Sequence, residues 1–132
     1  MAAADSKRSD LTIGVKDYAD CRLVTVSGRV DHTNSDVFLT DLSEHAEGVT
    51  EGGGLVVDLS ALEFITSAGL RALLLAQRSV QSSGAKLQVA GIGGVVKEVF
   101  RISKFDALLS VADSTEEAVA KISPAAAEAY SG

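Results

Sequence analysis

Hydrophobic and polar positions along this chain of 132 residues follow two periods, one typical of strands and one typical of helices. Apolar residues alternate with polar ones over 11–15, and a second extended run covers 23–30. The residues Asp17 to Asp20 between these runs are turn formers, so the fold is expected to open with a β-hairpin. Cys21 is expected near the start of the second strand, as a small buried hydrophobe.

The segment after the second strand predicts a helix. Asp31 to Ser35 is dense in residues that cap helix N-termini, and Phe38, Leu39 and Leu42 mark an inner face. This helix is expected to stop near Gly48. Two interpretations of Asp31 to Ser35 stay open, a turn that only caps the helix and a turn that also belongs to a functional site.

A third strand and a second helix form the centre of the chain. The apolar run Leu55 to Val57 predicts a buried strand that ends at Asp58, followed by a loop over 59–63. Thr66 or Ser67 is the natural N-cap of the next helix. A right-handed strand-helix-strand crossover makes the second and third strands parallel, which places Asp31 and Ser67 at the same edge of the sheet.

The helix after Ser67 has an apolar stripe formed by Ala72, Leu73, Ala76 and Val80. Arg71, Leu75 and Arg78 fall on the opposite, polar side, with Leu74 flanking the stripe. Leu74 and Leu75 beside two arginines, within two turns of Ser67, predict a docking surface. Contact with a neighbouring helix is the alternative explanation for these leucines.

The remaining pattern predicts a strand over 87–90, a helix over 95–102, a short strand over 108–111 and a last helix over 113–122. Gly91 to Gly94 fits a tight turn, because the third glycine of a dinucleotide-binding fingerprint would fall on Val96. The sequence therefore predicts one α/β domain over 10–123, with a mixed sheet of about five strands and about four helices. Residues 1–9 are expected to be disordered, and 124–132 to form a tail or a frayed helix.

Charge and composition narrow the function classes. Twelve basic and eighteen acidic residues give a net charge of −6, which disfavours direct binding to nucleic acid. A lone cysteine excludes an internal disulfide and fits a reducing compartment. No apolar run reaches the ~18 residues of a membrane span, so a cytoplasmic protein without membrane contact is expected.

The run from Asp58 to Leu70, with the pattern DLSxLxFITSAGL, resembles the signature of the STAS family, and in particular that of bacterial anti-sigma factor antagonists. Gly28-x-Val30-Asp31 and Val96-x-x-Val99-Phe100-x-x-Ser103 are similar to the same family. The resemblance implies a non-enzymatic switch, for which no cofactor is expected. His45 has no partner at metal-ligand spacing, so no metal site is expected either. In such proteins the serine matching Ser67 is phosphorylated by an ATP-binding partner that is both serine kinase and anti-sigma factor.

The resemblance further implies that the unphosphorylated form binds this partner and frees the sigma factor, and that a phosphatase resets the switch. An exposed strand at the edge of the hairpin can pair with a second copy of the chain, so the oligomeric state is expected to be a monomer or a weak homodimer. The candidate partner-binding residues are Asp31, His32, Thr33, Asp58, Thr66, Ser67, Ala68, Gly69, Arg71, Leu74, Leu75 and Arg78.

Three positions depart from the family pattern. Thr66 stands where aspartate is common and Ala68 where a second serine is common, so Thr66 becomes a minor alternative phosphoacceptor. Gly69 matches the family, and its lack of a side chain is expected to let a partner approach closely. Lys104 replaces a glycine, which leaves the preceding helix without its easiest left-handed terminator.

Three other functions compete with the switch. The position of Ser67, taken by itself, fits a residue that only caps the helix. A STAS domain can also regulate another effector, such as a phosphatase, a cyclase or a transport complex. A serine hydrolase with Asp31, His32 and Ser67 as its triad is disfavoured, because Ser67 lacks the first glycine of the G-x-S-x-G motif.

Overall fold

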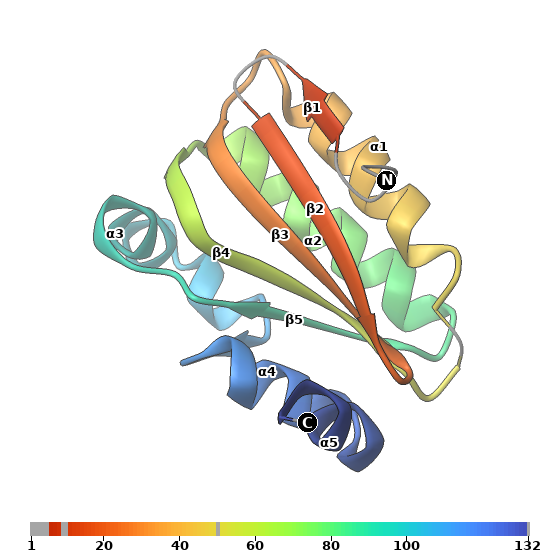
Figure 1. The fold of residues 1–132 in the computed structure, drawn as a ribbon. Coiled ribbons are helices and arrows are strands. Elements are labelled where there is room, and N and C mark those ends of the chain that lie inside the picture. Colours follow the sequence, from red (N-terminus) through yellow and green to blue (C-terminus); the bar gives the residue numbers. More distant parts are fainter. Residues whose placement is uncertain (1–5, 9–10, 50, 132) are drawn as a thin grey trace.

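The computed structural model describes residues 6–8, 11–49 and 51–131, and within them six strands form one sheet in the order β1-β2-β3-β4-β5-β6 (Figure 1). The strands are β1 (Ser6–Arg8), β2 (Leu11–Tyr18), β3 (Cys21–Val30), β4 (Gly54–Ile65), β5 (Lys86–Ala90) and β6 (Val111–Ala112). The helices are α1 (Ser35–Ala46), α2 (Ser67–Ser82), α3 (Gly94–Ile102), the 3₁₀ helix η2 (Phe105–Ala107), α4 (Thr115–Ile122) and α5 (Pro124–Ser131).

The sheet is mixed, as the sequence predicts. β2 and β3 form the expected antiparallel hairpin, and β3, β4, β5 and β6 are parallel to one another. β1 pairs with β2 in antiparallel register, with Arg8 opposite Leu11. The expectation of disorder over 1–9 is therefore wrong for Ser6–Arg8, and the remaining residues of that segment lie outside the described ranges.

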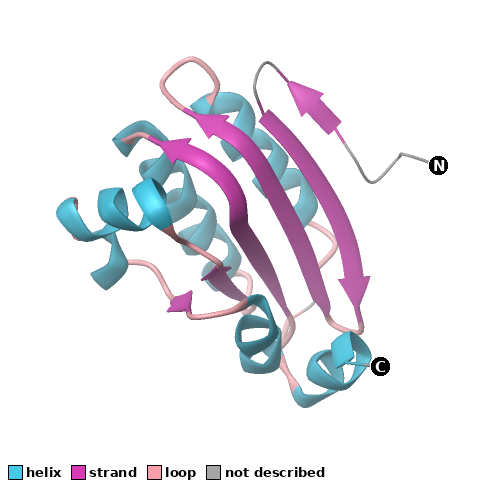
Figure 2. Cartoon of the chain, turned by 60° about the vertical axis from the view of Figure 1, so that its left-hand side comes forward, coloured by secondary structure: helices cyan, strands magenta, loops and turns pink. Residues whose placement is uncertain are grey.

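Helices cover both faces of the sheet, which produces two separate cores (Figure 2). Phe38 of α1 and Leu70 and Leu73 of α2 are fully buried against one face, together with Val24 and Val57 from the central strands. The opposite face packs against α4 and α5 through a second cluster of small and branched side chains: Cys21, Leu23, Val56, Ala90, Ala112, Ala118, Val119, Ile122 and Ala126.

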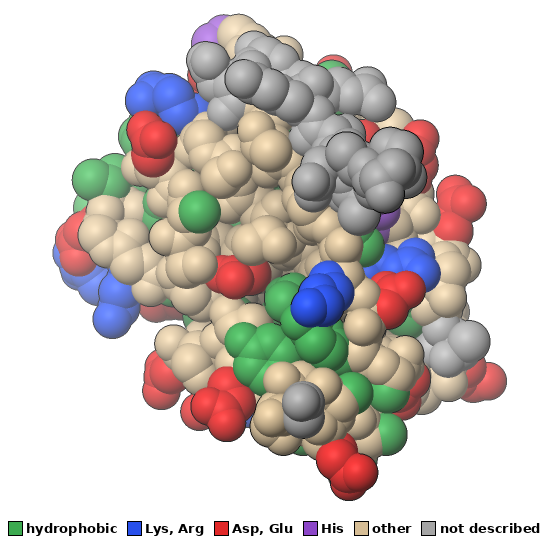
Figure 3. Space-filling model, in the orientation of Figure 1, with side chains coloured by type: hydrophobic (Ala, Val, Ile, Leu, Met, Phe, Trp, Pro, Cys, Tyr) green, Lys and Arg blue, Asp and Glu red, His purple; other side chains and the backbone are tan. Residues whose placement is uncertain are grey.

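Figure 3 shows this second face, where hydrophobic side chains gather over α5 in the lower part of the view. The ring of Tyr18 meets that of Tyr130 edge to face at 5.1 Å between centroids. Ser123 donates a hydrogen bond to Asp20 and accepts one from the Ala126 amide, so it caps α5 and ties it to the hairpin turn. The segment 124–132, expected as a tail or a frayed helix, thus contains a packed helix, α5, over Pro124–Ser131.

Strand β4 is longer than predicted, and the loop expected over 59–63 does not exist. The pairing of β3 with β4 continues from Cys21 opposite Gly54 to Val30 opposite Ile65. Two register shifts, after Thr25 and after Gly28, accommodate the extra residues of β4 as bulges. Bulges break the alternation of buried and exposed residues, which explains why the pattern resembled a loop.

The predicted strand over 108–111 is also corrected. Leu108 is 53% exposed and follows η2, so only Val111 and Ala112 extend the sheet. Lys104 itself adopts the left-handed conformation that the family assigns to glycine, with φ 64° and ψ 19°. Within the described ranges, no helix is long and apolar enough to cross a bilayer.

Candidate functional site

Ser67 is the first residue of α2, at the edge where β3 and β4 end. Thr66 precedes it in an extended conformation, and its amide donates to the Val30 carbonyl at 3.0 Å. The helix then starts with the Leu70 amide donating to the Thr66 carbonyl, also at 3.0 Å. Ser67 is exposed to solvent, whereas the Thr66 hydroxyl is buried without a hydrogen-bond partner.

The expected side-chain cap of α2 is absent, since neither Thr66 nor Ser67 accepts a hydrogen bond from a first-turn amide. The amides at this helix start are therefore not satisfied by a serine or threonine oxygen. The Ser67 hydroxyl makes no hydrogen bond within the described part of the chain, so modifying it would break none there.

Gly69 has a packing role that the sequence did not predict. It is buried, and a Cβ at this position would lie 2.7 Å from side-chain carbons of both Val30 and Ile65. The missing side chain lets the first turn of α2 pack on the ends of β3 and β4. Gly69 therefore supports the start of α2 from the inner side of the helix, and its contact with a partner stays a prediction.

A groove of about 610 Å³ starts at Ser67 and follows the exposed side of α2. It is lined by Ser67, Ala68, Arg71, Leu74, Leu75, Arg78 and Phe105. Positions 67, 71, 75 and 78 share one side of the helix because they are three or four residues apart. Leu75 is 42% exposed, so it is not covered by a neighbouring helix. The structure thus places together the α2 residues selected from the sequence, apart from the buried Gly69.

Phe105 is the groove residue that the sequence did not suggest. It belongs to η2, and a buried glutamine of α2 holds the segment that follows it. Gln77 donates to the Leu108 carbonyl at 3.1 Å and accepts from the Ser110 amide at 3.0 Å. These two hydrogen bonds fix the far wall of the groove to the helix that carries Ser67.

The groove is positively charged on an acidic protein. Among the described residues, Arg71 and Arg78 are the ionisable ones that line it, while the whole chain carries a net charge of −6. Neither guanidinium group makes an ion pair or a hydrogen bond within the described ranges. The groove therefore combines apolar side chains with two guanidinium groups that are free to bind an anionic group.

The turn after β3 lies beside the start of α2 and is internally braced. The Asp31 carboxylate accepts from the Thr33 amide at 2.9 Å and from the Thr33 hydroxyl. These hydrogen bonds, led by that of the hydroxyl, lower the pKa of the Asp31 carboxyl. Buried Asn34 donates to the Arg29 carbonyl at 2.9 Å and anchors the turn. Within the described ranges no hydrogen bond joins Asp31 to exposed His32, so the hydrolase triad is not assembled.

Asp58 does not belong to this edge. It lies inside β4, opposite Thr25 and Ala90, and is only 8% exposed. Its carboxylate accepts from the Ser60 amide at 2.9 Å. A Cβ at Gly91 would lie 2.8 Å from the same carboxylate. The structure supports a role for Asp58 in organising the irregular part of β4, and its contact with a partner stays a prediction.

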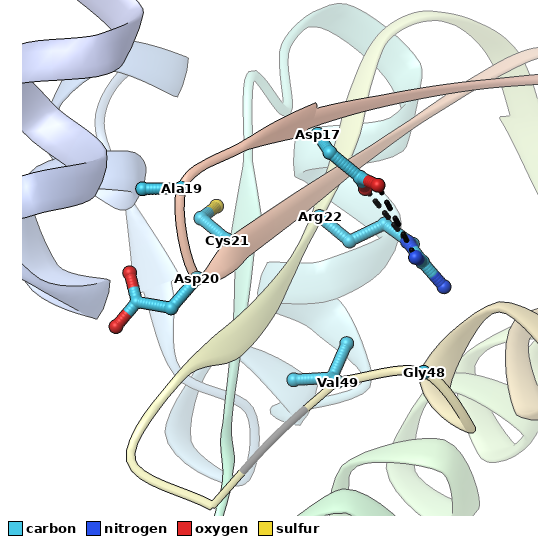
Figure 4. A pocket seen from close by; sticks show the side chains of 7 residues that line it. All are labelled: Asp17, Ala19, Asp20, Cys21, Arg22, Gly48 and Val49. Carbon is cyan, nitrogen blue, oxygen red and sulfur yellow. Dashed lines mark hydrogen bonds and ion pairs between the residues drawn. The ribbon is translucent and has the colours of Figure 1, made fainter.

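A smaller cavity of about 140 Å³ lies at the opposite end of the sheet (Figure 4). Arg22 there forms an ion pair with Asp17 at 2.7 Å and donates to the His45 carbonyl at 2.8 Å. Burial raises the pKa of the Cys21 thiol to about 12, which removes its nucleophilic thiolate. Asp17, Asp20 and Arg22 already have partners, so the residues that line this cavity serve to stabilise the hairpin.

Fold and site together define a small α/β domain that presents an exposed serine at a helix start beside a cationic groove. The STAS domain family model matches residues 12–118, so the chain belongs to the STAS domain family.

Comparison with individual proteins agrees with this assignment. The chain is 34% identical over 99 residues to BtrV of Bordetella bronchiseptica, a protein named as an anti-sigma factor antagonist. That alignment covers 74% of this chain and 83% of BtrV.

Solved structures show the same fold. An anti-sigma factor antagonist from Mycobacterium paratuberculosis matches with a TM-score of 0.75 at 21% identity, over 89% of this chain and 98% of that one. Unphosphorylated SpoIIAA, an anti-sigma factor antagonist, matches with a TM-score of 0.66 at 18% identity, over 83% and 95% of the two chains. The phosphorylated form of SpoIIAA, a Bacillus cell fate determinant, matches with 0.59 at 17% identity, over 84% and 99%.

Proposed function

We propose that this protein is a non-enzymatic anti-sigma factor antagonist controlled by phosphorylation of Ser67. The unmodified form binds a serine-kinase anti-sigma factor and thereby frees a sigma factor. The partner binds the ATP, its kinase activity transfers phosphate to Ser67 and ends the interaction, and a phosphatase restores the binding form. The observation that carries the proposal is an exposed serine hydroxyl at the head of a groove lined by apolar and cationic side chains.

The difference in exposure between the two neighbouring hydroxyls favours Ser67 over Thr66 as the phosphoacceptor. A kinase must bring the hydroxyl oxygen into line with the γ-phosphate of ATP. The Thr66 oxygen is enclosed by protein, and exposing it requires the end of β4 to move. Ser67 meets the requirement without any rearrangement of the strand or the helix.

The position of Ser67 also explains how phosphate could change binding without unfolding the domain. A phosphoserine adds about −1.5 to −2 charges at neutral pH. At a helix N-terminus the dipole favours such a charge by about 0.3–1 kcal/mol. A partner packed over Ala68 and the groove would instead have to take the phosphate dianion out of water, at a large desolvation cost.

The test is incubation with a serine-kinase anti-sigma factor from the same organism, followed by measurement of phosphate transfer and complex formation. Ser67→Ala is expected to abolish transfer. Ser35→Ala serves as the matched control, because Ser35 is the first residue of α1 as Ser67 is of α2, and it should leave transfer intact. Phosphate on another residue, with Ser67 unmodified, would refute the assignment.

Binding is tested with a matched pair of acidic substitutions on α2. Ser67→Asp is expected to weaken the complex while the circular dichroism spectrum is unchanged. Ser79→Asp places the same charge on an exposed position of the same helix outside the groove, and should bind as the wild type does. A stable complex with a protein that lacks kinase activity would indicate a different STAS circuit.

A further inference from the structure

Arg71 and Arg78 differ from the other arginines whose side chains the structure describes. Arg22 is paired with Asp17 and Arg101 with Glu98, and the Arg29 guanidinium lies 5.0 Å from the centre of the Phe64 ring. The two groove arginines have no such partner among the described residues. Both lie on the exposed side of the helix that Ser67 begins.

The spacing on α2 separates the two arginines. Arg71 follows Ser67 by four residues, so the two side chains are neighbours on one side of the helix. Arg78 is eleven residues from Ser67, which is about 16 Å along the axis. A phosphate on Ser67 is therefore within reach of the Arg71 guanidinium and beyond that of Arg78. An anion four residues before a cation is also the favourable order with respect to the helix dipole.

We propose that phosphorylation of Ser67 changes the group with which Arg71 pairs, an inference that rests on the function proposed above. In the unmodified protein, Arg71 pairs with an acidic side chain on an apolar segment of the partner that occupies the groove. Once Ser67 is phosphorylated, Arg71 pairs with the phosphate of its own chain. Phosphorylation then both adds a dianion at the edge of the interface and removes the cation that the partner needs.

The chemistry of the groove supports this occupant. Leu74, Leu75 and Phe105 offer apolar surface in the groove beside the two guanidinium groups, and none of the lining residues that the structure describes is acidic. An acidic and apolar partner segment complements both features, and a basic one does not. Guanidinium groups bind carboxylates and phosphates through the same paired N–H donors, so the two ligands compete for Arg71 directly. Asp36 of α1 lines the adjoining cavity with Arg71, and no ion pair joins them.

The first experiment needs no partner. Phosphoserine is incorporated genetically at position 67, and the second pKa of the phosphate is measured by ³¹P NMR in the wild type, Arg71→Gln and Arg78→Gln. The helix start acts equally on all three proteins, so differences between them report the arginines. The pKa is expected to be about half a unit higher in Arg71→Gln than in the wild type, and unchanged in Arg78→Gln. Equal values in all three proteins would overturn the pairing.

The second experiment uses the kinase identified by phosphate transfer, without nucleotide. Arg71→Gln in the unmodified protein is expected to weaken the complex about tenfold and to reduce its salt dependence. Lys97→Gln removes an exposed cation of α3 outside the groove and should leave affinity unchanged. Wild-type affinity of Arg71→Gln would refute the contact with the partner. Because the NMR titration is independent of any kinase, failure of the proposed function and failure of the Arg71 pairing remain distinguishable.

Discussion

Replacing Gln77 by methionine tests whether two hydrogen bonds hold the far wall of the groove. Methionine has nearly the same length and helix propensity as glutamine, and it cannot replace either bond. The variant loses the donor to the Leu108 carbonyl and the acceptor of the Ser110 amide. At about 1 kcal/mol for each net hydrogen bond, the free energy of unfolding should fall by about 2 kcal/mol. Leu108 and Ser110 are exposed residues, so water can reach the segment and the loss should not exceed this value greatly.

The assay for this prediction is urea unfolding combined with amide hydrogen exchange. A loss of about 2 kcal/mol corresponds to a midpoint shift of about 1 M urea at a typical m-value. The Ser110 amide should also exchange faster. Gln81→Met is the matched control, because Gln81 lies one turn further along α2 and is exposed. Equal midpoint shifts in the two variants, or unchanged exchange at Ser110, would show that the Gln77 hydrogen bonds do not hold this segment.

Three further predictions concern the backbone and the buried thiol. Gly69→Ala should lower the free energy of unfolding by about 1 kcal/mol in a denaturation curve, since overpacking outweighs the gain in helix propensity. Gly93→Ala, with no atom within 4 Å of the new methyl group, should stay within about 0.5 kcal/mol of the wild type. Lys104→Gly should raise stability by about 0.5–1 kcal/mol, seen as a higher melting temperature, because glycine adopts the left-handed conformation without steric cost. A thiol reagent at pH 8 should label Cys21 at the rate of unfolding, because the side chain is only 1% exposed and the reagent cannot reach it in the folded protein; labelling within seconds in the native state would contradict its burial.

The residues of the site on α2 could be predicted because helical periodicity is a local property. The spacing of Ser67, Arg71, Leu75 and Arg78 assigns them to one side of a helix wherever that helix lies. Phe105 could not be found in the same way. It reaches the groove through a 3₁₀ turn that depends on a buried side chain of α2, and such long-range contacts leave no periodic signal in one sequence.

The errors in the fold have physical causes of the same kind. Bulges in the pairing of β3 with β4 hid the second half of β4, because an unpaired residue shifts the alternation of faces. Pro124 predicted the end of a helix, yet proline also suits the first turn of a new one, where its missing N–H group needs no partner. Ser123 makes that restart possible by capping α5. In both places the sequence showed a break in pattern without showing what continued after it.

The two sides of helix α2 have different roles. The buried side fixes the position of Ser67, and the exposed side carries the charge that phosphorylation would change. Gly69 and Leu70 face the core and fix where the helix begins, while the side chains of Ser67 and Arg71 are exposed and make no hydrogen bond to the described residues. A phosphate on Ser67 therefore alters the outer side without removing a described interaction on the inner side. For this reason the proposed control of binding requires no second conformation of the domain. It also follows that substitutions on the outer side can change partner affinity while the stability set by the buried side is preserved.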